Sequence, residues 1–377
     1  MSSYVRALVA VGRSEDARRI ARRVPDMAWR SAVMSHVAEA LAKAGMTGDA
    51  ASTAKEALSV AQQIPVNLGR SSSMISVAFA LAIAGHWAEA GNLARQIPDA
   101  PSRDAALSSV AAALARAGRW QEGRRLVNEI GDVTTRACAS SSVAIVLSKG
   151  SRLEDAALLL AQAQHLADDS TDLPAADYTR GCVAIALAKM GKPEDARRVA
   201  REIHEVQAHA QAMIALAAAL ARNGRWEEAE SLADDIPDVT ARARAFNSVA
   251  LVLATAGKWK EARRAAYRIQ DIEARSRALS CVAAALARAG ELDEASRTAD
   301  EAQRVAHRID GEGRSSALGW VAEGMAAAGR WKRARQVAEE VQDTSAQLRA
   351  YATILSQYAR LRHAVLPPNS AATDDED

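Results

Sequence analysis

Apolar and polar positions alternate along the chain with the period of a helix. Val249, Ala250 and Leu253 stand at i, i+1 and i+4, which is the spacing of an apolar stripe on an amphipathic helix. Gly257 interrupts this stripe, and a second one follows from Ala262 to Ile269. The pattern predicts two short helices joined by a glycine turn.

The two-helix pattern recurs along the chain. ALSSVAAALARAGRWQEGRRLVNEIGD, from Ala106 to Asp132, aligns without a gap with AFNSVALVLATAGKWKEARRAAYRIQD, from Ala245 to Asp271. A small turn residue marks each unit: Gly12, Gly45, Gly85, Gly118, Ser151, Gly191, Gly224, Gly257, Gly290 and Gly329. Their spacings are 33, 40, 33, 33, 40, 33, 33, 33 and 39 residues. The 377 residues therefore predict one repeat array of about ten units rather than two or three globular domains.

The ends of the predicted helices carry their own signals. Second helices end at short motifs, of which Ile97-Pro98-Asp99 and Ile236-Pro237-Asp238 are examples. Proline cannot continue a helix, and the aspartate that follows is a good N-cap for the next one. Three units are longer, and their extra length falls in Ala50–Ile64, Ala156–Asp168 and Ala295–Ile309. These stretches predict second helices lengthened by about two turns, which either dock a partner or a second copy or reflect drift in repeat length.

Composition narrows the fold class and the compartment. Hydrophobic residues make up 49% of the chain but aromatics only 4%, so there is little material for a sheet and the chain should be all-α. The formal charge of +2 argues against a nucleic-acid binder. Cys138, Cys182 and Cys281 are too scattered for a disulfide framework or a zinc site. With no signal-peptide layout and no membrane-length apolar run, we expect a soluble, cytoplasmic protein in a reducing compartment.

The repeat resembles the tetratricopeptide repeat (TPR), a helix–turn–helix unit of about 34 residues. The residues that carry the resemblance are the turn Gly257, the small residues of the first helix (Ala111, Ala217, Ala250, Ala283), the aromatic that opens the second helix (Trp87, Trp120, Trp226, Trp259, Trp331) and the small residue after it (Ala90, Ala229, Ala262, Ala295, Ala334). The resemblance covers residues 4–361 and implies an α-solenoid, a right-handed superhelix of about ten repeats of 33–40 residues. The proline of the TPR pattern falls several residues earlier here, which predicts a shorter second helix. Other families of helical-pair repeats of similar length therefore stay open as alternatives.

The two ends of the array differ from its middle. We expect residues 1–361 to form the solenoid, with a cropped first repeat and a capping helix at 346–361, and residues 362–377 to form a disordered acidic tail. The cropped start suggests a lost upstream domain or a start inside a longer array. Arrays that resemble this one form the sensor half of larger bacterial signalling ATPases.

Motifs for catalysis are absent from the sequence. It contains no phosphate-binding loop, no His-Glu-x-x-His zinc motif and no Gly-x-Ser-x-Gly nucleophile elbow. His204 and His209 are the closest histidine pair, but they flank a predicted helix junction and do not suggest a metal site. Cys182 and Cys281 occupy the same repeat position and are expected to be buried structural thiols. We therefore expect a protein that is not an enzyme and has no cofactor or metal.

The strongest binding candidate is a basic row. Its members stand two residues before the turn residue: Lys43, Arg116, Lys149, Lys189, Arg222 and Arg288. In TPR-like arrays the first helices line the concave groove, so stacked repeats would bring these charges together and could hold an acidic peptide or a carboxylate. The alternative is that cations near a helix C-terminus only complement the helix dipole. Further groove candidates by the same mapping are Glu39, Phe79, Tyr178, Arg244, Asn247, Arg277 and Glu323.

These features favour a non-enzymatic scaffold that binds an acidic peptide or an acidic partner protein in its groove. The alternatives are a sensor or regulatory module of a bacterial signalling or defence system and, against the near-neutral charge, a nucleic-acid-binding repeat protein. No membrane partner is expected, and homo-oligomerisation stays open.

Overall fold

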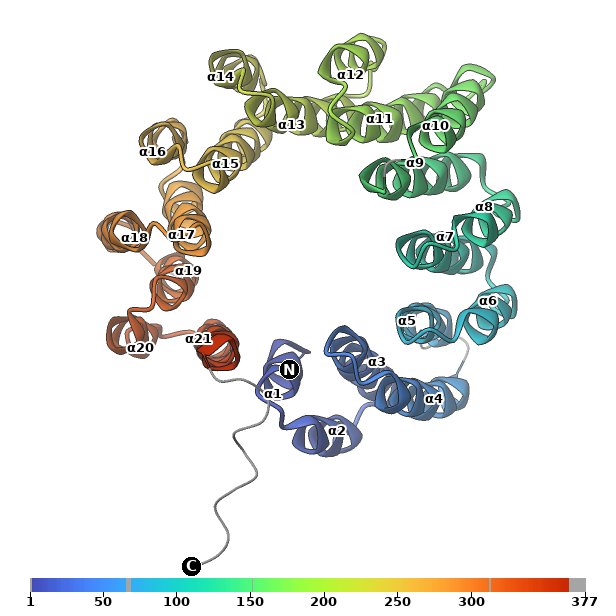
Figure 1. The fold of residues 1–377 in the computed structure, drawn as a ribbon, viewed down its shortest axis with the longest axis horizontal. Coiled ribbons are helices and arrows are strands. Elements are labelled where there is room, and N and C mark those ends of the chain that lie inside the picture. The colour runs from blue at the N-terminus through green and yellow to red at the C-terminus, as the bar shows by residue number, and fades with distance from the viewer. Residues whose placement is uncertain (1, 66–68, 151, 312, 366–377) are drawn as a thin grey trace, which may run out of the picture. The chain divides into compact units, whose positions relative to one another are not determined.

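The computed structural model describes residues 2–65, 69–150, 152–311 and 313–365, and in this part of the chain it contains 21 α-helices and no strand (Figure 1). The first helices of the repeats are α1 (Ser2–Ala10), α3 (Met27–Lys43), α5 (Arg70–Ile83), α7 (Ala100–Arg116), α9 (Val133–Lys149), α11 (Leu173–Lys189), α13 (Val206–Arg222), α15 (Val239–Thr255), α17 (Ile272–Arg288), α19 (Gly313–Ala327) and α21 (Thr344–Val365). The second helices are α2 (Ser14–Arg22), α4 (Thr47–Gln63), α6 (Trp87–Arg95), α8 (Trp120–Asn128), α10 (Leu153–Asp168), α12 (Pro193–Ala200), α14 (Trp226–Asp234), α16 (Trp259–Tyr267), α18 (Leu292–Ala306) and α20 (Trp331–Glu339). The predicted all-α array of helix pairs is confirmed.

The turn residues and the caps behave as the sequence predicts. Every glycine of the turn-residue series has a positive φ, for example +83° at Gly45 and +72° at Gly257, a conformation in which a side chain is strained. Ser151, the one non-glycine in this series, lies outside the described residues. The side chains of Asp99 and Asp238 accept hydrogen bonds from the backbone N–H groups of Ser102 (3.0 Å) and Ala241 (2.6 Å). In such repeats, a turn glycine therefore ends the first helix, and an aspartate cap begins the first helix of the next repeat.

The three lengthened second helices are present. Helices α4, α10 and α18 have 17, 16 and 15 residues, whereas α6, α8 and α14 have nine each and α12 has eight. The difference is about two helical turns. The short second helices also agree with the early position of the proline in the repeat.

Alanine supplies much of the buried surface. The small residue near the start of the second helix is fully buried in repeat after repeat, as Ala90, Ala229, Ala262, Ala295 and Ala334 show. The tryptophans that open five of these helices are half-buried. A methyl group at the contact lets two helix axes approach closely. Because this leaves little room between the helices, the large tryptophan rings pack at the margin of the interior.

The contacts divide the chain into two compact units, of which the larger spans residues 18–249. In it, each first helix from α3 to α11 packs against the next first helix, and each second helix from α4 to α12 packs against the first helix on either side of it. The first helices form the inner layer of this unit and the second helices its outer layer (Figure 1).

The other unit comprises residues 1–17 and 250–377. Helices α17, α19 and α21 pack in sequence, with α18 and α20 against them. Helix α1 packs against α21, although the two stand at opposite ends of the sequence. Two expectations are corrected here. Helix α21 has a partner on a face that a terminal cap would leave to solvent, and it runs to Val365, beyond the boundary at 361. Residues 366–377 of the predicted tail lie outside the described residues.

Candidate binding site

The basic row predicted from the sequence lies at the carboxyl ends of first helices. Lys43, Arg116, Lys149, Lys189, Arg222 and Arg288 are the last residues of α3, α7, α9, α11, α13 and α17, and all six are exposed. Helices α7, α9, α11 and α13 are neighbours in the larger unit and run in one direction, because one antiparallel second helix separates each from the next. Their last residues therefore line one edge of the inner layer, beside the glycine turns. The row borders this layer and does not lie in its middle.

Three members of the row have local partners. The Lys43 Nζ lies 2.6 Å from Glu39 Oε1. Arg222 Nε donates to the Ala218 carbonyl at 3.2 Å, and Arg288 Nε donates to the Ala284 carbonyl at 3.1 Å. Burial lowers the pKa of the Arg222 guanidinium, which nevertheless stays charged because arginine titrates far above neutral pH. The two arginines thus satisfy carbonyls at a helix C-terminus, as the dipole interpretation predicts.

The other three cations are available. Among the described residues, the side chains of Arg116, Lys149 and Lys189 have no hydrogen-bonded or ionic partner. They stand on three consecutive first helices, α7, α9 and α11. The free positive charge of the row is therefore concentrated on the larger unit.

Other predicted groove residues differ in their surroundings. Tyr178, on α11, is 58% exposed. On α15, an Arg244 Nη donates to Gln211 Oε1 at 3.4 Å, and the buried Asn247 Oδ1 has no hydrogen-bond partner among the described residues. Phe79 is half-buried. These side chains are spread over several helices of the inner layer and do not converge on one point.

The smaller unit brings two predicted groove residues together. The Arg277 guanidinium lies over the Trp320 ring at 4.9 Å from its centroid, a cation–π distance. Burial raises the pKa of Glu323, which accepts a 3.2 Å hydrogen bond from Thr353 Oγ1. Burial also raises the pKa of the Cys281 thiol, which lies close enough to Arg277 and Glu323 to feel both charges. Cys281 is thus a half-buried free thiol rather than the fully buried one that was expected, and its raised pKa lowers the fraction of thiolate.

The other two cysteines contradict the sequence expectation. Cys138 on α9 and Cys182 on α11 form a disulfide, with Cα atoms 5.4 Å apart. The 44 residues between them are one lengthened repeat plus one turn of helix, so adjacent first helices bring the two side chains face to face. The turn-residue series contained this signal, because it places the two cysteines one helical turn apart in register on adjacent first helices, but the expectation from the sequence used only their spacing along the chain. The disulfide also removes the basis for expecting a reducing compartment.

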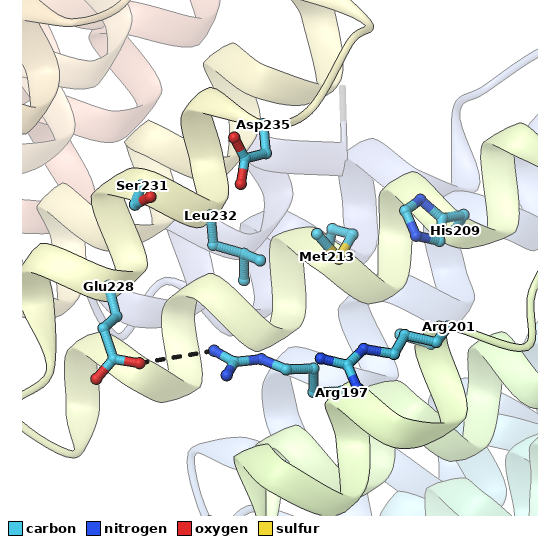
Figure 2. Close-up of a pocket in the computed structure, with 9 residues that line it drawn as sticks. Arg197, Arg201, His209, Met213, Glu228, Ser231, Leu232 and Asp235 are labelled. Carbon is cyan, nitrogen blue, oxygen red and sulfur yellow. Dashed lines mark ion pairs between the residues drawn. The ribbon is translucent and has the colours of Figure 1, made fainter.

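A charged pocket of about 340 Å³ lies in the outer layer of the larger unit, between α12 and α14 with α13 beneath (Figure 2). An Arg197 Nη lies 3.7 Å from Glu228 Oε2 across it. Met213 and Leu232 occupy the space between Arg201 and Asp235 (Figure 2). Half-buried His209 lines the same pocket. From the sequence, this histidine is considered only as a candidate metal ligand beside His204, and the pocket is missed.

Two structural side-chain series also escaped the sequence reasoning. An arginine near the start of the first helices α3, α5 and α17 donates to the carbonyl six residues before it, as in Arg30 to Val24 (2.6 Å) and Arg275 to Ile269 (2.7 Å). Buried Asp177 accepts hydrogen bonds from the backbone N–H groups of His204 (2.8 Å) and Glu205 (2.7 Å) in the next repeat. The arginine series was visible as a repeat position, whereas the aspartate occurs too rarely to give a signal.

Two negative observations apply to the described part of the chain. It contains no group of three or more His, Cys, Asp or Glu side chains placed to hold a metal ion. It also contains no helix that combines the length and the apolar character needed to cross a bilayer.

Stacked helix pairs with glycine turns, buried alanines and half-buried tryptophans define a helical-repeat protein, and the chain is TPR-like. The family model described as tetratricopeptide repeat matches residues 1–23 and 210–235.

Comparison with solved structures finds matches of low sequence identity. Ton1535 from Thermococcus onnurineus NA1 is 15% identical, with 94% of this chain and 99% of that chain covered and a TM-score of 0.30. A circular tandem repeat protein with novel repeat topology is 12% identical, with 96% and 88% covered and a TM-score of 0.22. The anaphase-promoting-complex hetero-tetramer Cut9-Hcn1 is 10% identical, with 98% of this chain and 93% of that chain covered and a TM-score of 0.22. The search of curated proteins finds no match.

Proposed function

We propose that this protein is a non-enzymatic scaffold that binds an acidic peptide or protein segment along the basic row of the larger unit. The observation that carries the proposal is the set of three unpartnered cations, Arg116, Lys149 and Lys189, at the ends of consecutive first helices. Arg222 extends the same edge with its charge retained. A repeat array offers a long surface and needs no enclosed catalytic pocket.

The spacing of the row suggests how the ligand is patterned. Packed helices lie roughly 8–10 Å apart, and an extended chain advances about 3.3 Å per residue. One helix step therefore corresponds to about three residues of extended peptide. A segment with Glu or Asp at every third position would place one carboxylate at each of Arg116, Lys149, Lys189 and Arg222.

Isothermal titration calorimetry can test this with a synthetic peptide that carries Glu at every third position. We expect binding that weakens with added salt and that falls at least tenfold in the variant R116E/K149E/K189E/R222E. The peptide with the same composition but clustered glutamates is expected to bind more weakly. Equal affinity of wild type and the quadruple variant would contradict the proposal.

A matched control separates the row from net charge. Arg23, Lys55, Arg125 and Arg198 are exposed residues on or next to second helices of the same unit. Changing all four to Glu alters the charge equally at the outer layer. We expect this control variant to keep most of the peptide affinity, since only the residual long-range attraction is lost.

A further inference from the structure

The outer layer of the larger unit carries ion pairs that join second helices of successive repeats. Arg22 on α2 makes two hydrogen bonds to Glu56 on α4, both 2.8 Å. Arg95 on α6 makes two to Glu129, directly after α8, at 2.8 and 2.9 Å. In both pairs the partners stand 34 residues apart. The arginine fork and the glutamate match each other in these paired bonds.

Arg201 and Asp235 stand in the same register, yet they do not meet. They are also 34 residues apart, directly after α12 and α14, but among the described residues neither side chain has a hydrogen-bonded or ionic partner. Aspartate is one methylene group shorter than the glutamate of the closed pairs. The pocket of about 340 Å³ occupies this junction.

A second departure from the repeat coincides with the first. At the start of α13, His209 stands at the position where α3, α5 and α17 have an arginine that donates to the carbonyl six residues earlier, as Arg70 does to Ile64 at 2.6 Å. The imidazole is too short to make this bond and instead lines the pocket. Two shorter side chains, Asp235 and His209, therefore line a pocket whose charges stay unpaired, whereas Arg95 and Glu129 pair across the pocket of about 490 Å³ at the α6–α8 junction.

The chemistry of the pocket indicates the ligand. It presents one unpaired cation (Arg201) and one unpaired anion (Asp235) with apolar Met213 and Leu232 between them (Figure 2). The other charges, Arg197 and Glu228, belong to an ion-pair network with Glu194 and Arg225 in which two cations balance two anions. A free amino acid carries both its charges on one carbon, whereas a short peptide separates them by its backbone. The volume falls at the lower end of small-molecule pockets, roughly 300–1,000 Å³.

We propose that the pocket between α12 and α14 binds a short zwitterionic peptide with apolar side chains. Its carboxylate binds Arg201, its ammonium group binds Asp235, and an apolar side chain covers Met213 and Leu232. This site lies in the outer layer and is independent of the basic row.

The test is titration of the full-length protein with the dipeptide leucyl-leucine, followed by ligand-observed NMR and calorimetry. The dipeptide is expected to bind, and N-acetyl-leucyl-leucine amide, which lacks both charges, is expected to bind at least tenfold more weakly, because each charged hydrogen bond contributes about a factor of ten or more. Arg201→Gln should lower the affinity for leucyl-leucine by about tenfold. No binding, or equal binding of both peptides, would overturn the proposal.

Asp235→Glu provides the sharper variant, because it restores the side-chain length of the closed pairs. We expect the longer carboxylate to pair with Arg201, to neutralise the two charges that hold the peptide termini, and so to abolish dipeptide binding while circular dichroism shows an intact fold. The matched control is Asp195→Glu on α12, which makes the same change at a carboxylate that pairs with Arg198 outside the pocket and should leave leucyl-leucine affinity unchanged. Unchanged binding in Asp235→Glu would contradict the proposed site. The quadruple variant of the basic row should bind the dipeptide normally, so the two proposals fail independently.

Discussion

At the scale of single residues, a buried aspartate connects successive first helices at two places in the array. Asp177 on α11 binds the N–H groups that open α13, and Asp104 on α7 binds the Asp132 N–H at 2.8 Å before α9. Burial alone would raise the pKa of Asp177, but the Glu205 and His204 N–H groups, with the charges of His204 and Arg180, hold it below its usual 3.8. The ionised carboxylate thus connects one first helix to the start of the next.

Replacing Asp177 by Ala leaves two backbone donors without their acceptor. We expect the free energy of unfolding to fall by about 2 kcal/mol at neutral pH, measured by urea denaturation. Because folding depresses this pKa, the stabilisation exists above 3.8 and is lost as pH falls through the folded-state pKa. The difference in free energy of unfolding between wild type and Asp177→Asn should therefore become smaller as the pH is lowered. Glu202→Gln, which removes an exposed partner of Arg180 at 3.7 Å, should change stability little, and an equal loss there would refute the argument.

Glu323 predicts the opposite pH dependence. Burial raises its pKa above 4.5, against the opposing effects of Thr353, Arg349 and Arg277. Folding then favours the protonated carboxyl, so its contribution is complete below 4.5 and is lost as pH rises through the folded-state pKa. Glu323→Gln should raise stability at neutral pH by up to ~1 kcal/mol and have no such effect in acid.

Glu39→Gln is the control, because Glu39 holds the same repeat position but pairs with Lys43. It should give no stabilisation in thermal melts at either pH. A destabilised Glu323→Gln protein at neutral pH would show that the carboxylate has a stronger partner than Thr353.

At the scale of elements, small residues set how closely helices approach. A Cβ added to Gly123 on α8 would lie 2.8 Å from the Ala111 carbonyl oxygen on α7. The backbone of α7 cannot move away without disturbing its packing on α5 and α9. Glycine is therefore required at this contact, although most repeats have alanine at the corresponding position.

We expect Gly123→Ala to lower the free energy of unfolding by about 1–3 kcal/mol, as overpacking does. Gly91→Ala on α6 is the comparison, since its nearest new contact is a flexible arginine nitrogen at 3.5 Å. Alanine is the better helix former by about 1 kcal/mol, so this change should raise the midpoint of thermal unfolding. Two equal shifts in one direction would contradict the close-approach argument.

The Cys138–Cys182 disulfide connects neighbouring elements α9 and α11. By closing a loop of 44 residues in the unfolded chain, it should stabilise the larger unit by about 2–4 kcal/mol. Thermal melts with and without dithiothreitol measure this. The reductant should lower the melting temperature of wild type and of Cys281→Ser but not that of C138S/C182S. Titration of three free thiols in the untreated, denatured protein would show that the bond does not form.

At the scale of the whole molecule, the contact between α1 and α21 connects the two ends of the sequence within one compact unit. Val5 and Leu8 of α1 and Ala350 of α21 are buried. Repeat arrays gain stability from each neighbour interface. The N-terminal helix should thus stabilise a unit formed mostly by residues 250–365.

Leu8→Ala is expected to cost about 2–4 kcal/mol in this unit, as buried Leu-to-Ala changes do. Hydrogen exchange read by mass spectrometry should show faster exchange in α21 and α19, while peptides from α7 and α9 stay protected. Faster exchange confined to α1 would mean that the contact contributes nothing to the smaller unit.

The sequence by itself determined the repeat. Turn glycines such as Gly257, caps such as Asp99 and the lengths of α4, α10 and α18 follow from local backbone chemistry and helical period, and these act within a few residues. It also placed Arg116, Lys149 and Lys189 at equivalent positions of successive units. What those positions bind was beyond local reasoning.

Only the tertiary structure decided the features that depend on which side chains meet across repeats. Three such features involve residues far apart in sequence. They are the Cys138–Cys182 bond, the contact of α1 with α21 and the open junction between Arg201 and Asp235. Their formation depends on distances of a few ångströms, such as the one methylene group by which aspartate is shorter than glutamate. A repeat pattern fixes the register of such partners, but packing decides whether they touch.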